Sequence, residues 1–354
     1  MTDKIRILVI DDSAFNRRTI IKMLESIPGI EVVDYACDGE EGLRKVFDLK
    51  PDLITLDLEM PRLDGFSFLR IVMQNRPTPV IVVSARSDNE NVFKALEFGA
   101  VDFVSKPSSR ISPELFNIRD DLVSKIHEAA NANMLKVLKR AARSKDQSDT
   151  FSSHSRVNRG TNKNAINHVV IGASTGGPPA LQAIFSNIKN PVEVFFAVSQ
   201  HMPPGFTKAF ADRLNKYCPL EIKEAEAGDI VRSGRVLIAP GGKNLEFRRH
   251  QNDVVAVVSE ARIGQRYVPS VDIMFNSAVK VFGSDLLGVV LTGMGNDGAL
   301  GTAHIKEHGG LTLAESEDSC VVFGMPKEAI ATGKVDWVKP LARISEKILS
   351  KCGY

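Results

Sequence analysis

A serine flanked by glycines stands directly after an apolar run in the second half of the chain. Residues 172–177 read Gly-Ala-Ser-Thr-Gly-Gly, and Pro178 follows where a helix can begin. This matches Gly-x-Ser-x-Gly, in which the glycines permit a tight turn from strand to helix that exposes the serine hydroxyl. Amides at the start of a helix also favour a developing negative charge. Ser174 is therefore a candidate nucleophile.

A serine nucleophile needs a base, and the chain has seven histidines. Only His201 directly follows an apolar run that a parallel sheet would end at the same edge as Ser174. Asp297 lies at that edge too, in a glycine-rich loop after residues 287–291. A carboxylate there would fix the imidazole tautomer; a plain helix cap is the alternative. The order Ser, His, Asp differs from that of the α/β-hydrolases, so we expect a different fold with the same chemistry.

Two other chemistries fit parts of this region. A glycine-rich turn can cradle a nucleotide phosphate, but the Gly-x-Gly-x-x-Gly fingerprint is missing and His201 stands where that fold needs an acid. Residues 304–308 match the His-x-x-Glu-His pattern of some metalloproteases. They precede Gly309 and Gly310, a typical helix C-terminus, where the helix dipole favours histidine. We therefore favour the serine hydrolase.

A second set of reactive side chains occupies the first part of the chain. Its members each follow an apolar run, and they are Asp11, Asp12, Asp57, Ser84 and Lys106. Because the carboxyl ends of parallel strands share one edge, these side chains should converge. Three carboxylates in one crevice repel one another unless a hard cation such as Mg²⁺ lies among them. The lysine and the hydroxyl can then hold a phosphate.

The elements that position these groups alternate between β-branched runs and amphipathic stretches, which is typical of parallel sheets covered on both faces. In the first half, we expect strands at residues 5–10, 32–36, 53–56, 80–83 and 103–104, and helices from residues 14, 39, 65, 89 and 113. In the second half, we expect strands at residues 168–173, 193–198, 236–239, 287–291 and 311–314, and helices from residues 178, 206, 271, 298 and 325. A β-hairpin turning at Asn252 and Asp253 joins residues 245–247 and 254–258.

The fold class is therefore α/β, with two doubly wound parallel-sheet domains: one flavodoxin-like, the other Rossmann-like with a β-hairpin insertion. The length of 354 residues agrees with two domains of roughly 150 residues each. We place the first domain at residues 1–125, a helical and basic linker at 126–165, and the second domain at 166–354. The linker suits a solvated tether or, as the alternative, a docking site for an acidic partner.

Composition excludes several classes of protein. Lys plus Arg number 45 against 43 Asp plus Glu, so no overall charge excess favours nucleic acid or an anionic membrane. No signal peptide begins the sequence, and no apolar run approaches the roughly 20 residues that span a bilayer. We expect a cytoplasmic protein without membrane insertion. The four cysteines are far apart, which argues for reduced thiols rather than disulfides or a zinc site.

Residues 5 to about 125 resemble a two-component receiver domain. The matching positions are Asp11 and Asp12, Asp57 with the Met-Pro-x-x-Asp-Gly of residues 60–65, Ser84 and Ala85, Phe103, and Lys106 with Pro107. The resemblance implies that Asp57 accepts a phosphoryl group, and that Asp12 and Asp57 hold Mg²⁺ with help from Asp11. It further implies that Ser84 bonds the phosphoryl group, Phe103 changes rotamer and Lys106 pairs with the phosphate.

Residues 168 to about 350 resemble the catalytic domain of the chemotaxis receptor methylesterases, the CheB family. The matching segments are residues 171–177, 200–203, 238–242, 269–272, 291–298 and 323–326. The sequence departs from the family where Tyr267 and Val268 replace the usual His-Arg, and where Asn244 replaces a common histidine. These departures concern the substrate side of the site and leave the three triad positions unchanged.

The resemblance implies hydrolysis of glutamyl γ-methyl esters on methyl-accepting chemotaxis receptors, with release of methanol. Ser174 would attack, His201 would carry the proton and Asp297 would steady the imidazolium. The oxyanion would lie at backbone amides of Met294 and the loop around Thr175. Deamidation of receptor glutamines would share the acyl-enzyme. The hydrolase site would need no cofactor.

The implied phosphodonor is a chemotaxis histidine kinase, and we expect the receiver to gate access to the hydrolase until it is phosphorylated. The alternative from another class is a response regulator that binds DNA, which the basic linker suggests. No helix-turn-helix or basic recognition helix follows residue 165, so we expect no nucleic-acid partner. A third alternative is an α/β domain that binds a nucleotide at residues 172–177.

Overall fold

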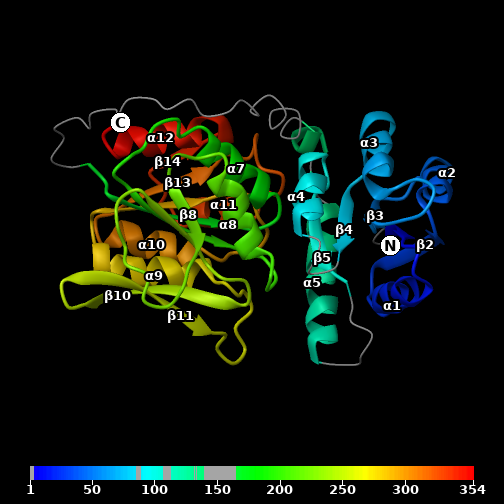
Figure 1. The fold of residues 1–354 in the computed structure, drawn as a ribbon, viewed down its shortest axis with the longest axis horizontal. Coiled ribbons are helices and arrows are strands. Elements are labelled where there is room, and N and C mark those ends of the chain that lie inside the picture. Colours follow the sequence, from blue (N-terminus) through cyan, green and yellow to red (C-terminus); the bar gives the residue numbers. More distant parts are fainter. Residues whose placement is uncertain (1–3, 85–88, 107–112, 131, 133, 139–164) are drawn as a thin grey trace. The chain divides into compact units, whose positions relative to one another are not determined.

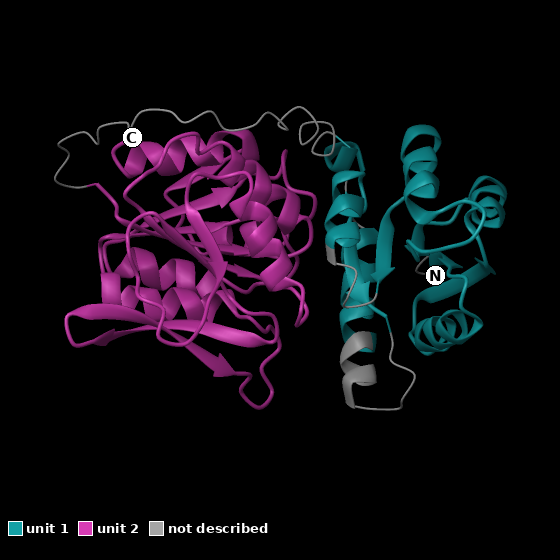
Figure 2. Ribbon diagram, in the orientation of Figure 1, with its two compact units in different colours: residues 1–145 teal, residues 146–354 magenta. Residues whose placement is uncertain are grey.

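The chain forms two compact units, residues 1–145 and residues 146–354 (Figure 2). The structure, a computed structural model, describes residues 4–84, 89–106, 113–130, 132, 134–138 and 165–354. Most of the predicted basic linker therefore lies outside the described residues, as do Ala85 and Pro107 of the receiver motif. Within the described ranges, no helix is long and apolar enough to cross a membrane.

The first unit is built on a five-stranded parallel sheet in the order β2-β1-β3-β4-β5 (Figure 1). Its strands are β1 (Ile5–Ile10), β2 (Ile30–Ala36), β3 (Leu53–Leu56), β4 (Val80–Ser84) and β5 (Asp102–Ser105). Its helices are α1 (Ala14–Glu25), α2 (Gly39–Leu49), α3 (Gly65–Asn75), α4 (Asn89–Glu97) and α5 (Pro113–Ala130). The strand order reverses between β1 and β3, which is where open α/β sheets bind ligands.

Side-chain caps fix where three helices of this unit begin. Ser13 caps α1, Asp38 caps α2 and Asp64 caps α3, each by accepting a hydrogen bond from a backbone amide of the first turn. Such a cap contributes about 1 kcal/mol, because it satisfies an amide that has no partner inside the helix. The helix starts expected from the sequence agree with these caps.

The second unit is built on a seven-stranded parallel sheet in the order β14-β13-β12-β6-β7-β9-β8. Its strands are β6 (His168–Ala173), β7 (Phe195–Gln200), β8 (Glu221–Glu224), β9 (Arg235–Ile238), β12 (Leu286–Val290), β13 (Leu311–Glu315) and β14 (Trp337–Lys339). Its helices are α7 (Gly177–Ser186), α8 (Thr207–Asn215), α9 (Val271–Phe282), α10 (Ala299–Glu307), α11 (Met325–Ala331) and α12 (Ile344–Lys351). The chain enters at β6, builds outward through β7, and returns to place β12 on the other side of β6. The predicted fold class, two doubly wound parallel-sheet domains, is confirmed.

A hairpin of β10 (Lys243–His250) and β11 (Asp253–Glu260) packs on α9 (Figure 1). It joins the core through Phe247, whose ring meets the edge of Phe195 with centroids 5.8 Å apart. The expected insertion is confirmed, but its turn was placed one residue too late. Asp253 already pairs with His250, so the two turn residues are Gln251, which has a φ of 55°, and its neighbour.

One further expectation about the second unit was wrong, and three of its elements were not expected. β7 begins at Phe195 rather than at Glu193, because the Glu193 amide donates to the Tyr354 hydroxyl (2.7 Å) instead of joining the sheet. The short edge strands β8 and β14 and the helix α12 were not expected from the sequence. Both strands lie at the edges of the sheet, away from the central strands that position the candidate site.

Candidate active site and acidic pocket

Three adjacent strands in the middle of the larger sheet bring the predicted hydrolase residues to one edge. Ser174 directly follows β6, His201 directly follows β7, and Asp297 lies in the loop between β12 and α10. β6 pairs in parallel with both β7 and β12. The carboxyl ends of these strands therefore meet, as the sequence argument required.

Asp297 holds the imidazole of His201. Its Oδ2 lies 2.8 Å from His201 Nε2, and its side chain is buried, with the residue 3% exposed. It also accepts hydrogen bonds from the Ser270 hydroxyl (3.0 Å) and from the amides of Val271 (2.7 Å) and Asp272 (2.9 Å). Burial alone would raise the pKa of Asp297, but the bonds from His201 and these amides outweigh it and lower the pKa. The carboxylate is therefore ionised when the imidazole needs a counter-charge.

Asp297 and Asp272 join two helix N-termini reciprocally. Asp297, which lies just before α10, accepts the first amides of α9. Asp272, in the first turn of α9, accepts the amides of Gly298 (3.0 Å) and Gly301 (2.7 Å) at the start of α10. Burial raises the pKa of Asp272 to about 6, and the Asp297 charge adds to this effect. Helix N-termini stabilise such carboxylates through their unpaired amides and the helix dipole.

The turn that carries Ser174 is held on both sides. The Ser174 amide donates to the Thr292 carbonyl (3.0 Å), and the Ser174 carbonyl accepts from the Gln200 side chain (3.0 Å). The loop after β12 approaches so closely that a Cβ on Gly293 would lie 2.6 Å from the Ser174 Cβ. The expected strand-to-helix turn is thus clamped between the loops that carry the other two residues.

The structure brings Ser174 and His201 to one edge without joining their side chains. Among the described residues, the Ser174 hydroxyl makes no hydrogen bond to the imidazole. Because Asp297 occupies Nε2, the other ring nitrogen, Nδ1, is the atom that can act as a base. Bonds between nucleophile and base are often long in free enzymes and tighten when substrate binds.

The expected oxyanion residues lie in the two loops that flank Ser174. Met294 follows Gly293, and the residue is 40% exposed. Within the described part of the chain its amide donates no hydrogen bond, so it remains available to a substrate oxygen. Thr175 is buried, and its carbonyl accepts from the Thr292 hydroxyl (3.0 Å).

Sequence reasoning missed several residues that contact the imidazole or its partner. Tyr267 stacks on His201, with ring centroids 5.0 Å apart and planes 7° from parallel. Ser270 and Asp272 bond Asp297, as described above. The motif at residues 269–272 was a signal for the latter pair, although the sequence assigned it no role. For Tyr267 the only signal was a departure from the family pattern.

The predicted acidic pocket forms at the corresponding edge of the first unit. Carboxylate oxygens of Asp11, Asp12 and Asp57 lie within 4.8 Å of one another, and Lys106 Nζ lies 2.6 Å from Asp57 Oδ2. Burial, with the Asp57 charge second, raises the pKa of Asp11 to about 6. Burial also raises the pKa of Asp57, although Lys106 opposes this. The single positive charge of Lys106 therefore does not balance the three carboxylates of the pocket.

This pocket fits a hard divalent cation. Asp11 is 1% exposed, and its Oδ2 has no hydrogen-bond partner within the described residues. A buried carboxylate oxygen without a donor is costly, and a cation among the three acids would satisfy it. Asp11, Asp12 and Asp57 are the residues that would hold Mg²⁺.

The two remaining receiver residues lie on the strands beside this pocket. Ser84, at the end of β4, is buried and faces Ser105 of β5 in the strand register. Phe103 is also buried, and its ring meets Phe93 edge-on with centroids 6.3 Å apart. Lys125 of α5 fixes the backbone there by donating to the Phe103 carbonyl (2.5 Å).

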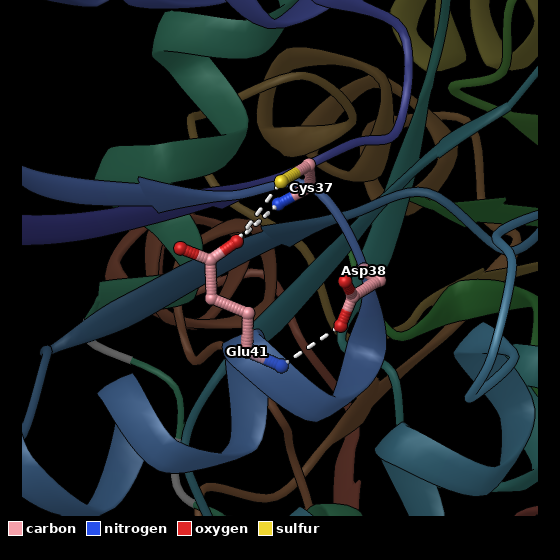
Figure 3. A group of neighbouring side chains, drawn as sticks. All are labelled: Cys37, Asp38 and Glu41. Carbon is pink, nitrogen blue, oxygen red and sulfur yellow. Dashed lines mark hydrogen bonds between the residues drawn. The ribbon is translucent and has the colours of Figure 1, made fainter.

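A second cluster with metal-ligand spacing has a local explanation. Figure 3 shows Cys37, Asp38 and Glu41 at the start of α2. Asp38 accepts the Glu41 amide (2.9 Å), while Glu41 Oε2 accepts the Cys37 amide (2.9 Å) and thiol (3.0 Å). This is the reciprocal pattern of a capping box, shifted by one residue. The cluster therefore serves the helix start.

The histidines of residues 304–308 lie at the end of α10, where the sequence placed them. His304 Nδ1 lies 2.6 Å from the Asn276 side chain, and His308 Nδ1 lies 2.8 Å from the His304 carbonyl. Neither belongs to a group of metal-ligating side chains in the described ranges. Nothing in this geometry favours the metalloprotease alternative.

Comparisons with known proteins match both units. Family models for the response regulator receiver domain and the CheB methylesterase match residues 7–113 and 169–348. A Geobacter sulfurreducens relative named protein-glutamate methylesterase/protein-glutamine glutaminase 3 is 53% identical, covering 99% of this chain and 98% of its own. The corresponding Myxococcus xanthus protein 1 is 46% identical over 96% and 95%. The crystal structure of the Thermotoga maritima CheB methylesterase catalytic domain, 40% identical, has a TM-score of 0.51 and covers 52% of this chain and 98% of that domain. The chain therefore belongs to the protein-glutamate methylesterase/protein-glutamine glutaminase family, in which a receiver domain precedes a CheB methylesterase domain.

Proposed function

We propose that this protein demethylates glutamyl γ-methyl esters on methyl-accepting chemotaxis receptors and releases methanol. The observation that carries the proposal is the 2.8 Å bond between buried, ionised Asp297 and His201 at the strand edge where Ser174 stands. The names of the full-length relatives support the substrate class. We also propose that the protein acts in the cytoplasm, together with the histidine kinase that we expect as its phosphodonor.

The reaction proceeds through an acyl-enzyme. The Ser174 Oγ attacks the ester carbonyl while His201 Nδ1 takes the hydroxyl proton. The tetrahedral intermediate collapses, and the imidazolium returns that proton to the departing methoxide. Water then attacks the acyl-enzyme by the same route and leaves a glutamate carboxylate. Asp297 stabilises the imidazolium in both halves.

The amide of Met294 and the loop around Thr175 bind the oxyanion. The support is the available Met294 N–H beside the serine turn. One oxyanion donor is typically worth about 100- to 1,000-fold in kcat. The same acyl-enzyme forms from a receptor glutamine with ammonia as the leaving group, so we also propose glutaminase activity.

We propose that the first unit controls this reaction by phosphorylation of Asp57, with a chemotaxis histidine kinase as donor. Asp11, Asp12 and Asp57 would hold Mg²⁺, which neutralises the charge gathered around the acceptor carboxylate. Lys106 already contacts Asp57 and would pair with the phosphoryl oxygens. Ser84 would bond the phosphoryl group, and Phe103 would change rotamer in response.

The control takes the form of a gate. The unphosphorylated receiver restricts access of the receptor helix to the Ser174 edge, and phosphorylation favours an accessible state. A differential stabilisation of a few kcal/mol suffices to shift such an equilibrium. The support is the presence of a phosphoryl-acceptor domain in the same chain as a hydrolase whose substrate is a bulky protein.

Replacement of Ser174 by alanine tests the hydrolase directly. We expect methanol release from methylated receptor membranes to fall at least about 1,000-fold, because the nucleophile is gone. Circular dichroism melting should match the parent protein, since the hydroxyl makes no hydrogen bond among the described residues. Retained turnover in a folded Ser174→Ala protein would refute the proposal.

A further inference from the structure

His201 is held by two different contacts, one at its edge and one at its face. Asp297 fixes the edge through Nε2 at 2.8 Å. Tyr267 covers the face, with ring centroids 5.0 Å apart and an angle of 7° between the planes. The two contacts together define the ring plane, and so the direction in which Nδ1 points.

We propose that Tyr267 is a positioning residue for the hydrolysis, acting through His201. Its ring holds the imidazole in plane and stabilises the imidazolium that forms when Ser174 loses its proton. The face of an aromatic ring carries partial negative charge, so it attracts a cationic imidazolium more strongly than it attracts a neutral imidazole. Because the imidazole gains its positive charge as Ser174 loses its proton, the contact strengthens in the transition state and accelerates the reaction. This role rests on the proposed function of His201 as the base.

The fold holds Tyr267 in this place from two directions. A Cβ on Gly295 would lie 2.2 Å from the Tyr267 hydroxyl oxygen, so the loop leading to Asp297 closes directly on the ring. On the other side, the Gln265 side chain donates to the Tyr267 carbonyl (2.6 Å). Gln265 is itself fixed by a pair of hydrogen bonds with Asn244 of β10 (2.8 and 3.0 Å). The stacked geometry is thus built into the site.

The charges around the imidazole act in opposite directions. Asp297, on the loop before α10, favours the imidazolium. The Arg266 guanidinium lies 5.0 Å from the Tyr267 ring centroid, and its charge disfavours the imidazolium.

The test compares Tyr267→Phe with Tyr267→Leu in the full chain. Phenylalanine keeps the ring face, whereas leucine keeps apolar bulk without it. We expect the leucine variant to lose about 3- to 30-fold in kcat for methanol release with KM little changed, and the phenylalanine variant to stay within about twofold. Tyr217→Leu is the matched control, because Tyr217 also lies near a cation, Arg213 at 5.9 Å, but not beside His201. It should behave like the parent protein.

A pH profile separates positioning of the base from simple packing. The acidic limb of kcat/KM reports protonation of the free enzyme. Loss of the ring face makes the imidazolium less favourable, so this limb should move to lower pH by about half to one unit in the leucine variant and stay in place in the phenylalanine variant. If leucine lowers the melting temperature, Tyr267→Met repeats the comparison with a more adaptable side chain.

Two outcomes overturn the proposal. Parent-like kcat and an unmoved acidic limb in a folded leucine or methionine variant would show that the ring face has no role. An equal loss in the phenylalanine variant would assign the effect to the hydroxyl instead. Ser174→Ala is assayed in parallel. Turnover that survives in Ser174→Ala would refute the proposed hydrolase itself. If Ser174→Ala loses turnover while Tyr267→Leu behaves like the parent protein, only the role of Tyr267 is refuted.

Discussion

Asp297 has a catalytic role in the proposed mechanism, and it also has a structural role. It holds the imidazole and accepts two amides and a hydroxyl at the start of α9. Hydrogen bonds from this many donors keep a buried carboxylate ionised. The residue that we propose as the counter-charge of the imidazolium therefore also fixes the start of α9.

We predict that Asp297→Asn loses both functions. An amide nitrogen in place of one oxygen would face backbone N–H donors, and the imidazole would lose its counter-charge. We expect kcat to fall about 10,000-fold and the free energy of unfolding to fall by about 1 to 3 kcal/mol. Methanol release and denaturant titration measure the two effects. Ser270→Ala, which removes a single donor, should lose less than about tenfold in kcat. A parent-like Asp297→Asn rate would contradict the assignment.

At the acidic pocket, the pKa of Asp11 gives a prediction with a definite sign. Burial, with help from Asp57, raises this pKa from 3.8 to about 6. A carboxyl with a raised pKa destabilises the fold when ionised: the cost is absent below the unfolded value and complete above the folded one. Asp11→Asn should therefore raise the stability of the first unit at pH 7.5, by about 1 to 3 kcal/mol without Mg²⁺, and leave it unchanged at pH 3.

Thermal scans check this prediction. The transition that Mg²⁺ moves in the parent protein identifies the first unit, and the variant is compared on that transition. The parent should bind Mg²⁺ more tightly as the pH rises through about 6, because protons then no longer compete for Asp11. Asp48→Asn is the control, since Asp48 is exposed and lies outside the pocket. A pH-independent effect of Asp11→Asn would show that the carboxyl is not strained by burial.

Several residue-level features could be predicted from the sequence, and others could not. Ser174, His201 and Asp297 each follow a strand, so the topology of a parallel sheet was enough to place them at one edge. The bond from Asp297 to Nε2 depends on a ring rotation that no spacing encodes. The stack of Tyr267 depends on the path of an irregular loop, which the hydrophobic pattern does not determine.

At the scale of elements, prediction succeeded where a local signal existed. Ser13, Asp38 and Asp64 are side chains that cap helices, so the starts of α1, α2 and α3 could be read directly. β8 reads Glu-Ile-Lys-Glu, and a single apolar residue gives no strand period. β14 has only three residues at a sheet edge. Such elements form because a neighbouring strand offers its hydrogen bonds, which is information outside their own sequence.

The loop after β12 gives a prediction of its own. A methyl group on Gly293 would lie 2.6 Å from both the Ser174 Cβ and the Met325 sulfur. We expect Gly293→Ala to displace the serine turn and lower kcat at least about tenfold, since small misplacements of reacting groups are costly. Gly228→Ala is the control: its Cβ would meet nothing within 4 Å, so it should cost about 1 kcal/mol of stability and leave the rate unchanged. Parent-like turnover in Gly293→Ala would show that the loop adapts.

At the scale of the whole molecule, regulation must connect two separately built units. Each has its own parallel sheet and its own buried core. Neither candidate site shares a described side chain with the other: the acidic pocket lies within residues 11–106, and the hydrolase residues within 174–297. Any control of the hydrolase by Asp57 therefore does not act through a described side chain that belongs to both sites.

We predict that a small-molecule phosphodonor with Mg²⁺ raises methanol release in the parent protein and has no effect on Asp57→Ala. Chelation of Mg²⁺ should remove the stimulation while leaving the basal rate, because the hydrolase triad uses no metal in the proposed mechanism. Deletion of residues 1–150 should raise the basal rate by removing the gate. Equal basal and stimulated rates in the parent, or a truncated protein no faster than the parent, would contradict the gate.

The reciprocal hydrogen bonds of Asp297 and Asp272 have an evolutionary consequence. Each carboxylate closes the start of the other's helix, so losing either one loosens both. The Ser174 hydroxyl holds no helix start. In a descendant that binds receptors without turnover, we expect Ser174 to be substituted first, and Asp297 to remain because the fold still needs it.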